Sequence, residues 1–87
     1  MEKEFDIQNR LGLHLRAAAQ FVKVANRFEC DLSVRRDDIT VNGKSIMGLA
    51  MLAAARGTRI AVNAEGREAA EALEALGALI ESKFGEE

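Results

Sequence analysis

Hydrophobic and polar residues alternate along four short segments of the chain, as they do in β-strands that bury one face. In the first segment, Phe5 and Ile7 share a face, and charged or polar residues stand between and around them. The pairs Asn42-Gly43 and Glu65-Gly66, which favour turns, end two of the other segments. The predicted strands are residues 2–8, 30–35, 39–41 and 60–64.

Three further segments place their apolar residues at helical spacing. The first covers residues 15–28 and the last covers residues 68–84. Between them, Ser45 stands immediately before the apolar residues 46–55, which predict a short helix that ends near Gly57. The apolar stripes of the two longer helices are Ala18, Phe21, Val22, Ala25 and Phe28, and Ala69, Leu73, Leu76, Ile80 and Phe84.

The predicted order of elements is β-α-β-β-α-β-α. Because each element has a single apolar face, the strands can form one sheet that the helices cover on one side. The other side of the sheet then faces solvent, which favours an antiparallel sheet. The predicted fold class is α+β, a two-layer open-faced sandwich with a four-stranded antiparallel sheet and three helices on one face.

Composition narrows the class of protein. The 87 residues suffice for one small domain, residues 1–87. A net charge of −2 and the lack of Trp and Tyr argue against a nucleic-acid-binding protein, which usually carries a basic excess or aromatic stacking residues. One cysteine and one histidine exclude an internal disulfide and argue against a metal centre. We expect the cysteine, Cys30, to be a buried strand residue.

Two patterns predict a cytoplasmic protein without membrane insertion. Residues 1–6 are acidic and alternating, unlike the basic and then apolar regions of a secretory signal. The longest apolar stretch, residues 46–55, is about half as long as the roughly 18 residues that cross a bilayer.

His14 is the first candidate for chemistry, because histidine changes charge nearest to neutral pH. It stands between Gly12 and the first turn of the first predicted helix. The free backbone N–H groups of a helix N-terminus form an anion site, and the helix dipole there favours a neutral imidazole. Arg16, two residues on, can offer a planar set of donors to a phosphoryl group. Together these features suggest capture of a phosphoryl group on a ring nitrogen.

Both residues also have simpler interpretations. A single histidine beside a helix start is commonly a loop or capping residue. An arginine in a first turn is commonly solvated, although its charge is unfavourable beside the positive end of the helix dipole. An incoming phosphate would reverse that unfavourable placement. On spacing alone, both interpretations remain open.

Three segments resemble the HPr family, the histidine-containing phosphocarrier proteins of the bacterial phosphotransferase system. Residues 9–19, NRLGLHLRAAA, are similar to the active-site signature of the family. Residues 42–49, NGKSIMGL, are similar to its regulatory-serine region. Residues 57–66, GTRIAVNAEG, are similar to its last strand and turn. The three segments follow the family order, and the family fold agrees with the predicted order of elements.

The resemblance implies a role for each residue of the first segment. His14 would accept a phosphoryl group on Nδ1 from phosphorylated enzyme I and donate it to a IIA sugar-permease component. Arg16 would assist the transferring phosphoryl group. Such a protein is a stoichiometric carrier rather than an enzyme, and it needs no cofactor and no metal. A carrier that exposes His14 to successive partners is most simply a monomer.

Two residues depart from the family pattern. Leu15 stands where a small residue is common, and Ala17 stands where a proline commonly follows the arginine. Alanine is a good helix former and leaves one more N–H group for an anion, so we expect Ala17 to tune the site. Leu15 could alter the choice of partner. Both departures leave open a specialised relative, such as a nitrogen-branch or other regulatory carrier.

Ser45 has two interpretations. Serine before an apolar helix is a good N-cap, worth roughly 1 kcal/mol. By resemblance, Ser45 is also the residue that HPr kinase/phosphorylase phosphorylates in many bacteria. A phosphate there would gain from the helix dipole and add negative charge to a docking surface. Gly43-Lys44-Ser45 is similar to the end of a P-loop, but Asp38 stands where the first glycine of that motif belongs, which argues against nucleotide binding.

The resemblance also implies an apolar docking surface on the first two helices. Met47 is the expected exposed contact, since methionine adapts to several partners. The other predicted partner-binding residues are Leu15, Ala17, Gln20 and Ala50, with Leu13 and Lys23 at the border. An interaction module without any phosphotransfer is the remaining alternative from a different class.

Overall fold

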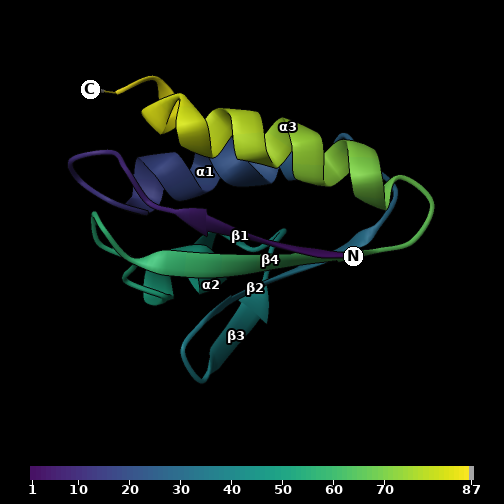
Figure 1. Cartoon of the computed structure of the whole chain (residues 1–87), viewed down its shortest axis with the longest axis horizontal. Coiled ribbons are helices and arrows are strands. Elements are labelled where there is room, and N and C mark those ends of the chain that lie inside the picture. The colour runs from purple at the N-terminus through teal and green to yellow at the C-terminus, as the bar shows by residue number, and fades with distance from the viewer. Residues whose placement is uncertain (87) are drawn as a thin grey trace.

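The structure is a computed structural model that describes residues 1–86. The elements follow the predicted order, with one short 3₁₀ turn added at the end (Figure 1). Along the chain they are β1 (Glu2–Asp6), α1 (Leu15–Ala25), β2 (Asp31–Arg36), β3 (Ile39–Asn42), α2 (Ile46–Met51), β4 (Arg59–Glu65), α3 (Ala69–Glu81) and η1 (Lys83–Gly85).

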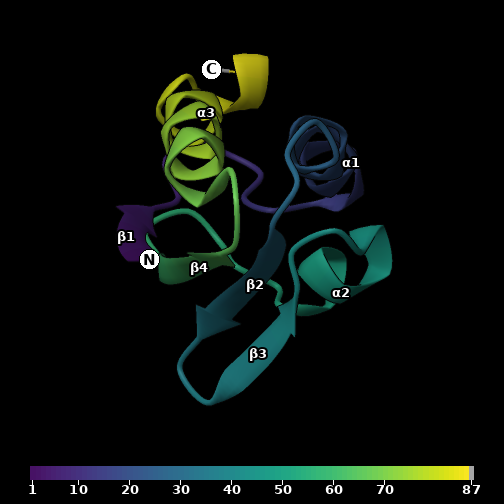
Figure 2. The same ribbon diagram turned by 90° about the vertical axis from the view of Figure 1, so that its right-hand side faces the viewer.

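The four strands form one antiparallel sheet in the order β1-β4-β2-β3. Phe5 lies opposite Ile60, and Val34 lies opposite both Val62 and Val41, so apolar residues of neighbouring strands share a face. Figure 2 shows α3, α1 and α2 on one side of this sheet. The prediction of an open-faced sandwich with three helices on one face is therefore confirmed.

The core lies between the sheet and the helices. Both long helices end three residues before their predicted ends, so Phe28 and Phe84 lie beyond α1 and α3. The stripe residues are buried, except that Phe28 is only partly buried. Within α3, Gly77 faces the ring of Phe5, and a Cβ atom on this glycine would lie 2.8 Å from Phe5 Cε1. The missing side chain thus makes room for the β1 aromatic ring against α3.

Helix α2 is shorter than the predicted residues 46–55. It ends at Met51, and two residues later Ala53 takes a left-handed conformation with φ of 52°. The turn directs the Ala54 carbonyl toward the Leu13 N–H, with an N–O distance of 2.8 Å. Because the chain leaves the helix to make this contact, the apolar run does not predict the helix end.

Cys30 also differs from its prediction. It lies one residue before β2 and is only partly buried. This partial burial raises the pKa of the Cys30 thiol, which opposes formation of a thiolate. The residue is therefore a poorly activated thiol at the edge of the core.

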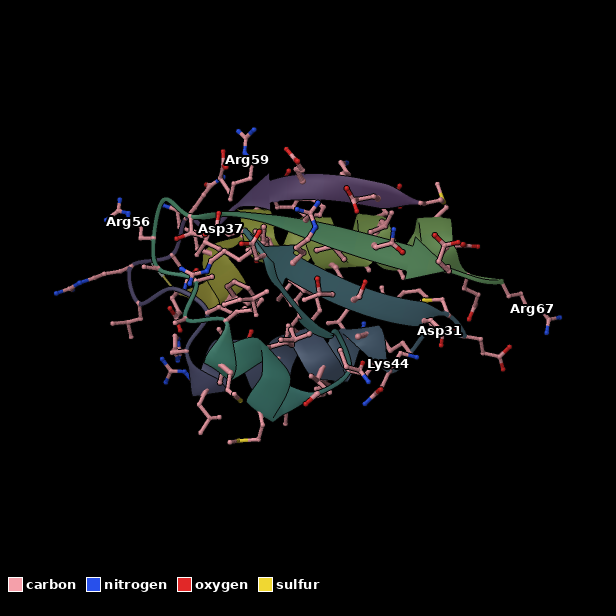
Figure 3. All side chains as sticks on the ribbon, turned by 90° about the horizontal axis from the view of Figure 1, so that it is seen from below. Asp31, Asp37, Lys44, Arg56, Arg59 and Arg67 are labelled. Atoms are coloured by element: carbon pink, nitrogen blue, oxygen red, sulfur yellow. The ribbon has the colours of Figure 1, made fainter. Side chains whose placement is uncertain are left out.

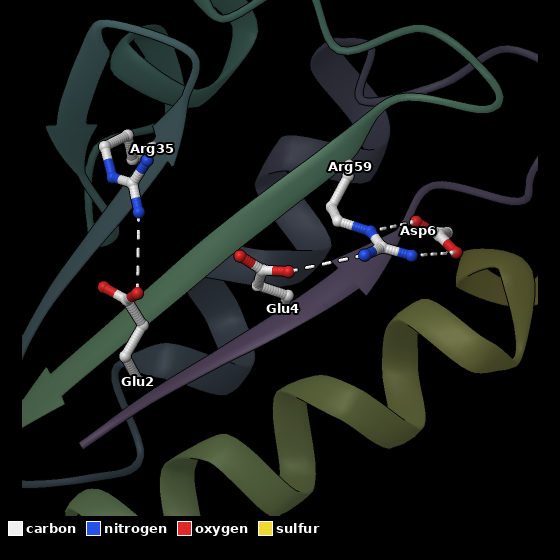
Figure 4. Close-up of polar contacts among 5 residues, drawn as sticks. All are labelled: Glu2, Glu4, Asp6, Arg35 and Arg59. Carbon is white, nitrogen blue, oxygen red and sulfur yellow. Dashed lines mark hydrogen bonds and ion pairs between the residues drawn. The ribbon is translucent and has the colours of Figure 1, made fainter.

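The open face of the sheet is charged. Arg59 Nε lies 2.9 Å from Asp6 Oδ1, and Arg35 Nη2 lies 3.5 Å from Glu2 Oε2 (Figure 4). The hydrogen bond and charge of Arg59 lower the pKa of Asp6. Figure 3 shows Arg56, Arg59 and Arg67 extending outward from β4 and its flanking loops. This face carries solvated ion pairs, which contribute little to stability individually.

Candidate functional site

The loop between β1 and α1 is fixed by Asn9 and Gly12. Asn9 is fully buried, and its Nδ2 donates to the Gly12 carbonyl over 2.7 Å. Gly12 has φ of 71°, and a Cβ atom there would lie 2.5 Å from the Ala54 carbonyl oxygen. Only glycine fits both the left-handed backbone and this close approach. The loop therefore sets the position at which α1 begins.

His14 is the N-cap residue of α1 and stands directly before its first turn, where the sequence places it. Its backbone is extended, with φ of −76° and ψ of 178°, and its carbonyl accepts the N–H of Ala18. Its side chain makes no capping hydrogen bond and instead contacts the C-terminal part of the chain. The His14 side chain is 25% exposed, so it is accessible from solvent.

The carboxylate of Glu86 lies against His14. The distance from His14 Nε2 to Glu86 Oε2 is 2.5 Å, and Arg16 Nη2 lies 3.3 Å from the same oxygen. The other oxygen, Oε1, accepts a hydrogen bond from Asn9 Nδ2 over 3.1 Å. Three donor-bearing side chains thus surround one carboxylate, whose side chain is only 13% exposed.

This environment lowers the pKa of Glu86. The hydrogen bond from Asn9 is the largest cause, and it outweighs the opposing effect of burial. The hydrogen bonds with His14 and Arg16 lower the pKa of Glu86 further. The carboxyl group is therefore an anion at neutral pH, held at the N-terminus of α1.

A left-handed turn after α3 carries Glu86 to this place. Lys83, Phe84 and Gly85 have φ of 59°, 55° and 74° in succession. Phe84 is buried, which anchors the turn in the core. Figure 1 shows the C-terminal end of the chain, in yellow, on the same side of the molecule as the start of α1.

Glu86 and the role of Asn9 are absent from the predictions made from the sequence. An acidic residue near the chain end carries no motif, and 72 positions separate it from His14. The signal for Asn9 was its position three residues before Gly12 in the loop segment. A buried amide that fixes such a loop can be suspected from this spacing, but its second contact with Glu86 cannot.

Ser45 caps α2, as predicted. Its Oγ accepts the backbone N–H of Gly48 over 3.0 Å. Nearby, Lys44 Nζ donates to the Phe28 carbonyl over 2.9 Å, so the lysine ties this turn to the end of α1. The Ser45 side chain is partly exposed.

The predicted docking residues divide into exposed and buried ones. Leu15 and Met47 are 59% and 66% exposed, and Gln20 and Ala50 are partly exposed. Ala17 is fully buried, because it faces the core from the first turn of α1. Its side chain therefore offers no surface to a partner, which corrects that prediction. Three more apolar residues are exposed beside Leu15 and Met47 in the sequence: Leu11, Ile46 and Met51.

No helix within residues 1–86 combines the length and the apolar character that a membrane span requires. The same residues contain no cluster of three or more His, Cys, Asp or Glu side chains that could hold a metal ion.

Comparison with known proteins places this geometry in a family of phosphocarriers. The family model described as "PTS HPr component phosphorylation site" matches residues 1–82. The phosphocarrier protein HPr of Neisseria meningitidis serogroup A is 48% identical over 86 residues, which cover 99% of this chain and 97% of that protein. The phosphocarrier protein HPr of Pseudomonas aeruginosa is 50% identical over 84 residues, which cover 95% and 93%.

Solved structures of HPr proteins have the same fold as this chain. The crystal structure of HPr from Thermoanaerobacter tengcongensis matches with a TM-score of 0.95 and 46% identity, and covers 100% of this chain and 98% of that one. A phosphocarrier protein HPr from Bacillus anthracis matches with a TM-score of 0.87 and 45% identity over 92% and 95% of the two chains. The chain belongs to the HPr family of the phosphotransferase system.

Proposed function

We propose that His14 is the phosphoryl acceptor, with Nδ1 as the reacting atom. Enzyme I in its phosphorylated form is the proposed donor, and a IIA sugar-permease component is the proposed acceptor. The observation that carries this assignment is the convergence of His14, Arg16 and Asn9 on one carboxylate at the start of α1. A place that already holds an anion suits a transferring phosphoryl group.

The chemistry needs no cofactor. The Nδ1 lone pair attacks phosphorus, while the bond from phosphorus to the donor atom breaks and returns its electron pair to the donor. Arg16 and Arg10 line a depression beside Glu86, and Arg16 shares the Glu86 carboxylate with His14, so we expect the Arg16 guanidinium to meet the incoming negative charge. Onward transfer reverses these steps and regenerates His14. The protein acts as a stoichiometric carrier, not as an enzyme.

Docking in this proposal uses the apolar surface of Leu15 and Met47, with Gln20 and Ala50 at its border. Leu15 directly follows His14, so a partner seated there reaches the ring. In this proposal the protein is cytoplasmic. It acts as a monomer, because His14 has to meet one partner after another.

Intact-mass analysis after incubation with phosphoenolpyruvate and enzyme I tests the proposed acceptor. The native protein is expected to gain one acid-labile phosphoryl group, and the His14→Ala variant none. Arg16→Ala is expected to accept the group more slowly. A gain by His14→Ala overturns the assignment of His14, and a gain only with a nitrogen-branch enzyme I assigns the chain to the nitrogen-branch alternative. No gain with either enzyme favours the interaction module.

A second proposed site is Ser45, as a substrate of HPr kinase/phosphorylase. Ser45 is partly exposed, and its Oγ accepts the first-turn N–H of Gly48, where a phosphate oxygen can take over the cap. The added charge would weaken docking to an acidic partner. Ser45→Asp is expected to bind enzyme I less tightly than the native protein, as measured by calorimetry. Equal affinity would contradict the electrostatic effect.

A further inference from the structure

We propose that Glu86 is a positioning residue for phosphoryl transfer, a role that rests on the proposed function of His14. Its carboxylate holds the proton of His14 on Nε2 and leaves Nδ1 as the nucleophilic nitrogen. The proton then stays on Nε2 through both halves of the transfer.

The contact with Glu86 decides which ring nitrogen of His14 carries hydrogen. An ionised carboxylate can only accept hydrogen bonds, so the nitrogen facing Glu86 Oε2 has to donate. A neutral imidazole carries one ring hydrogen, and a hydrogen on Nε2 leaves the lone pair on Nδ1. A carboxylate that orients a histidine in this way also fixes its tautomer in triads and metal sites.

The Glu86 carboxylate is itself held in place by hydrogen bonds to both of its oxygens. Oε1 is bound by Asn9, which is fully buried and whose amide also donates to the Gly12 carbonyl. Oε2 is bound by His14 and Arg16. Because each oxygen has a separate donor, rotation of the carboxylate would break at least one contact. Arg16 therefore acts on the ring through Glu86 as well as on the phosphoryl group.

A left-handed backbone turn brings Glu86 to the site. Left-handed backbone is unfavourable for residues with a Cβ, and here Lys83 and Phe84 adopt it in succession. Burial of Phe84 offsets part of this strain. Strained backbone that persists beside a reactive group is often linked to function, and here it places a carboxylate against His14.

The charge balance explains what the contact does in the reaction. When Nδ1 forms its bond to phosphorus, the ring still carries the Nε2 proton and becomes a cation. The Glu86 carboxylate lies directly against that cation and stabilises it. When the bond to phosphorus breaks, its electron pair returns to Nδ1 and the neutral ring with Nε2–H is restored. Neither direction requires a proton to leave or arrive.

Nitrogen-15 spectra of the His14 ring and the rate of phosphoryl acceptance together test this role. The neutral ring of the native protein is expected to be in the Nε2–H tautomer. Glu86→Ala is expected to show a larger share of the Nδ1–H tautomer and to accept phosphoryl about tenfold more slowly. Glu86→Gln keeps an acceptor oxygen, so it should recover the tautomer while its rate stays between the two.

Glu81→Ala is the matched control, because it removes an exposed carboxylate from the end of α3, near the same chain terminus. It should match the native protein in both measurements. Unchanged spectra in Glu86→Ala would overturn the proposed tautomer, and changed spectra with an unchanged rate would overturn the role in transfer. If the native protein accepts no phosphoryl group, the proposed function fails, while the spectra still decide whether Glu86 sets the tautomer.

Discussion

At the scale of single residues, backbone conformation decides which side chains can build the site. Gly12 combines a positive φ with an approach to the Ala54 carbonyl that leaves no space for a Cβ atom. Gly57 also has a positive φ, 89°, but nothing lies within 4 Å of its Cβ position. A side chain at Gly12 would therefore meet both an unfavourable backbone conformation and a steric clash, whereas a side chain at Gly57 would meet only the unfavourable conformation.

We expect Gly12→Ala to lower the free energy of unfolding by about 3 kcal/mol, since both costs apply there. Gly57→Ala should lower it by about 1 kcal/mol, from the conformation alone. Denaturant unfolding of the two variants measures the difference. Equal losses would mean that the loop before His14 moves away from Ala54 without cost.

Some residues of the site can be predicted from the sequence, and others cannot. Gly12 and His14 belong to a recognisable segment, and the N-cap positions of His14 and Ser45 follow from their places before apolar runs. Glu86 could not be predicted, because its position depends on a left-handed turn that no local pattern indicates.

At the scale of elements, periodicity predicts which face of each helix and strand is buried, because burial repeats with the geometry of the element. The stripes are confirmed within α1 and α3, whereas Phe28 and Phe84 lie beyond the ends of these helices. The end of α2 is not, since Ala53 leaves the helix so that Ala54 can meet Leu13. Element ends depend on contacts with distant residues, which spacing along one segment does not contain.

Helix α3 allows a test in which packing opposes helix propensity. Gly77→Ala favours the helix by about 1 kcal/mol, but its Cβ atom would lie 2.8 Å from Phe5 Cε1. Overpacking of a well-filled core costs about 1–3 kcal/mol, so we expect a net loss of stability of about 1 kcal/mol.

In a Phe5→Leu background the same substitution should become stabilising, because the aromatic ring is gone. Denaturant unfolding of the four proteins gives the coupling between positions 5 and 77. Stabilisation by Gly77→Ala in the native background would show that Phe5 shifts easily and that the glycine is not needed for packing.

At the scale of the whole molecule, the fold brings the loop after β1 and the last described residues of the chain to one place. The sheet sets this arrangement, since β1 pairs with β4 and α3 packs across both. The contacts of Glu86 with His14, Arg16 and Asn9 thus join the last described residue to the loop near the start of the chain. Their formation should be visible in global stability as well as in transfer.

The dependence of the free energy of unfolding on pH measures how much the contacts of the Glu86 carboxylate stabilise the fold. The pKa of Glu86 in the folded protein is lowered from its ordinary value of 4.5, mainly by Asn9. Between the two pKa values the unfolded state binds more protons than the folded state, so stability rises with pH there. The contribution of Glu86 should be fully present above pH 4.5 and disappear as the pH falls through the lower, folded value.

Glu86→Gln isolates this contribution, because it removes the titrating group and leaves the Asp6–Arg59 pair intact. Thermal unfolding of the native protein and this variant should show a constant difference in Tm at neutral pH that shrinks in acid. A difference that stays constant down to pH 3 would mean that the carboxylate charge does not stabilise the fold. In that case the contact at His14 would depend on the shape of the side chain alone, and its role in holding the Nε2 proton would have no electrostatic basis.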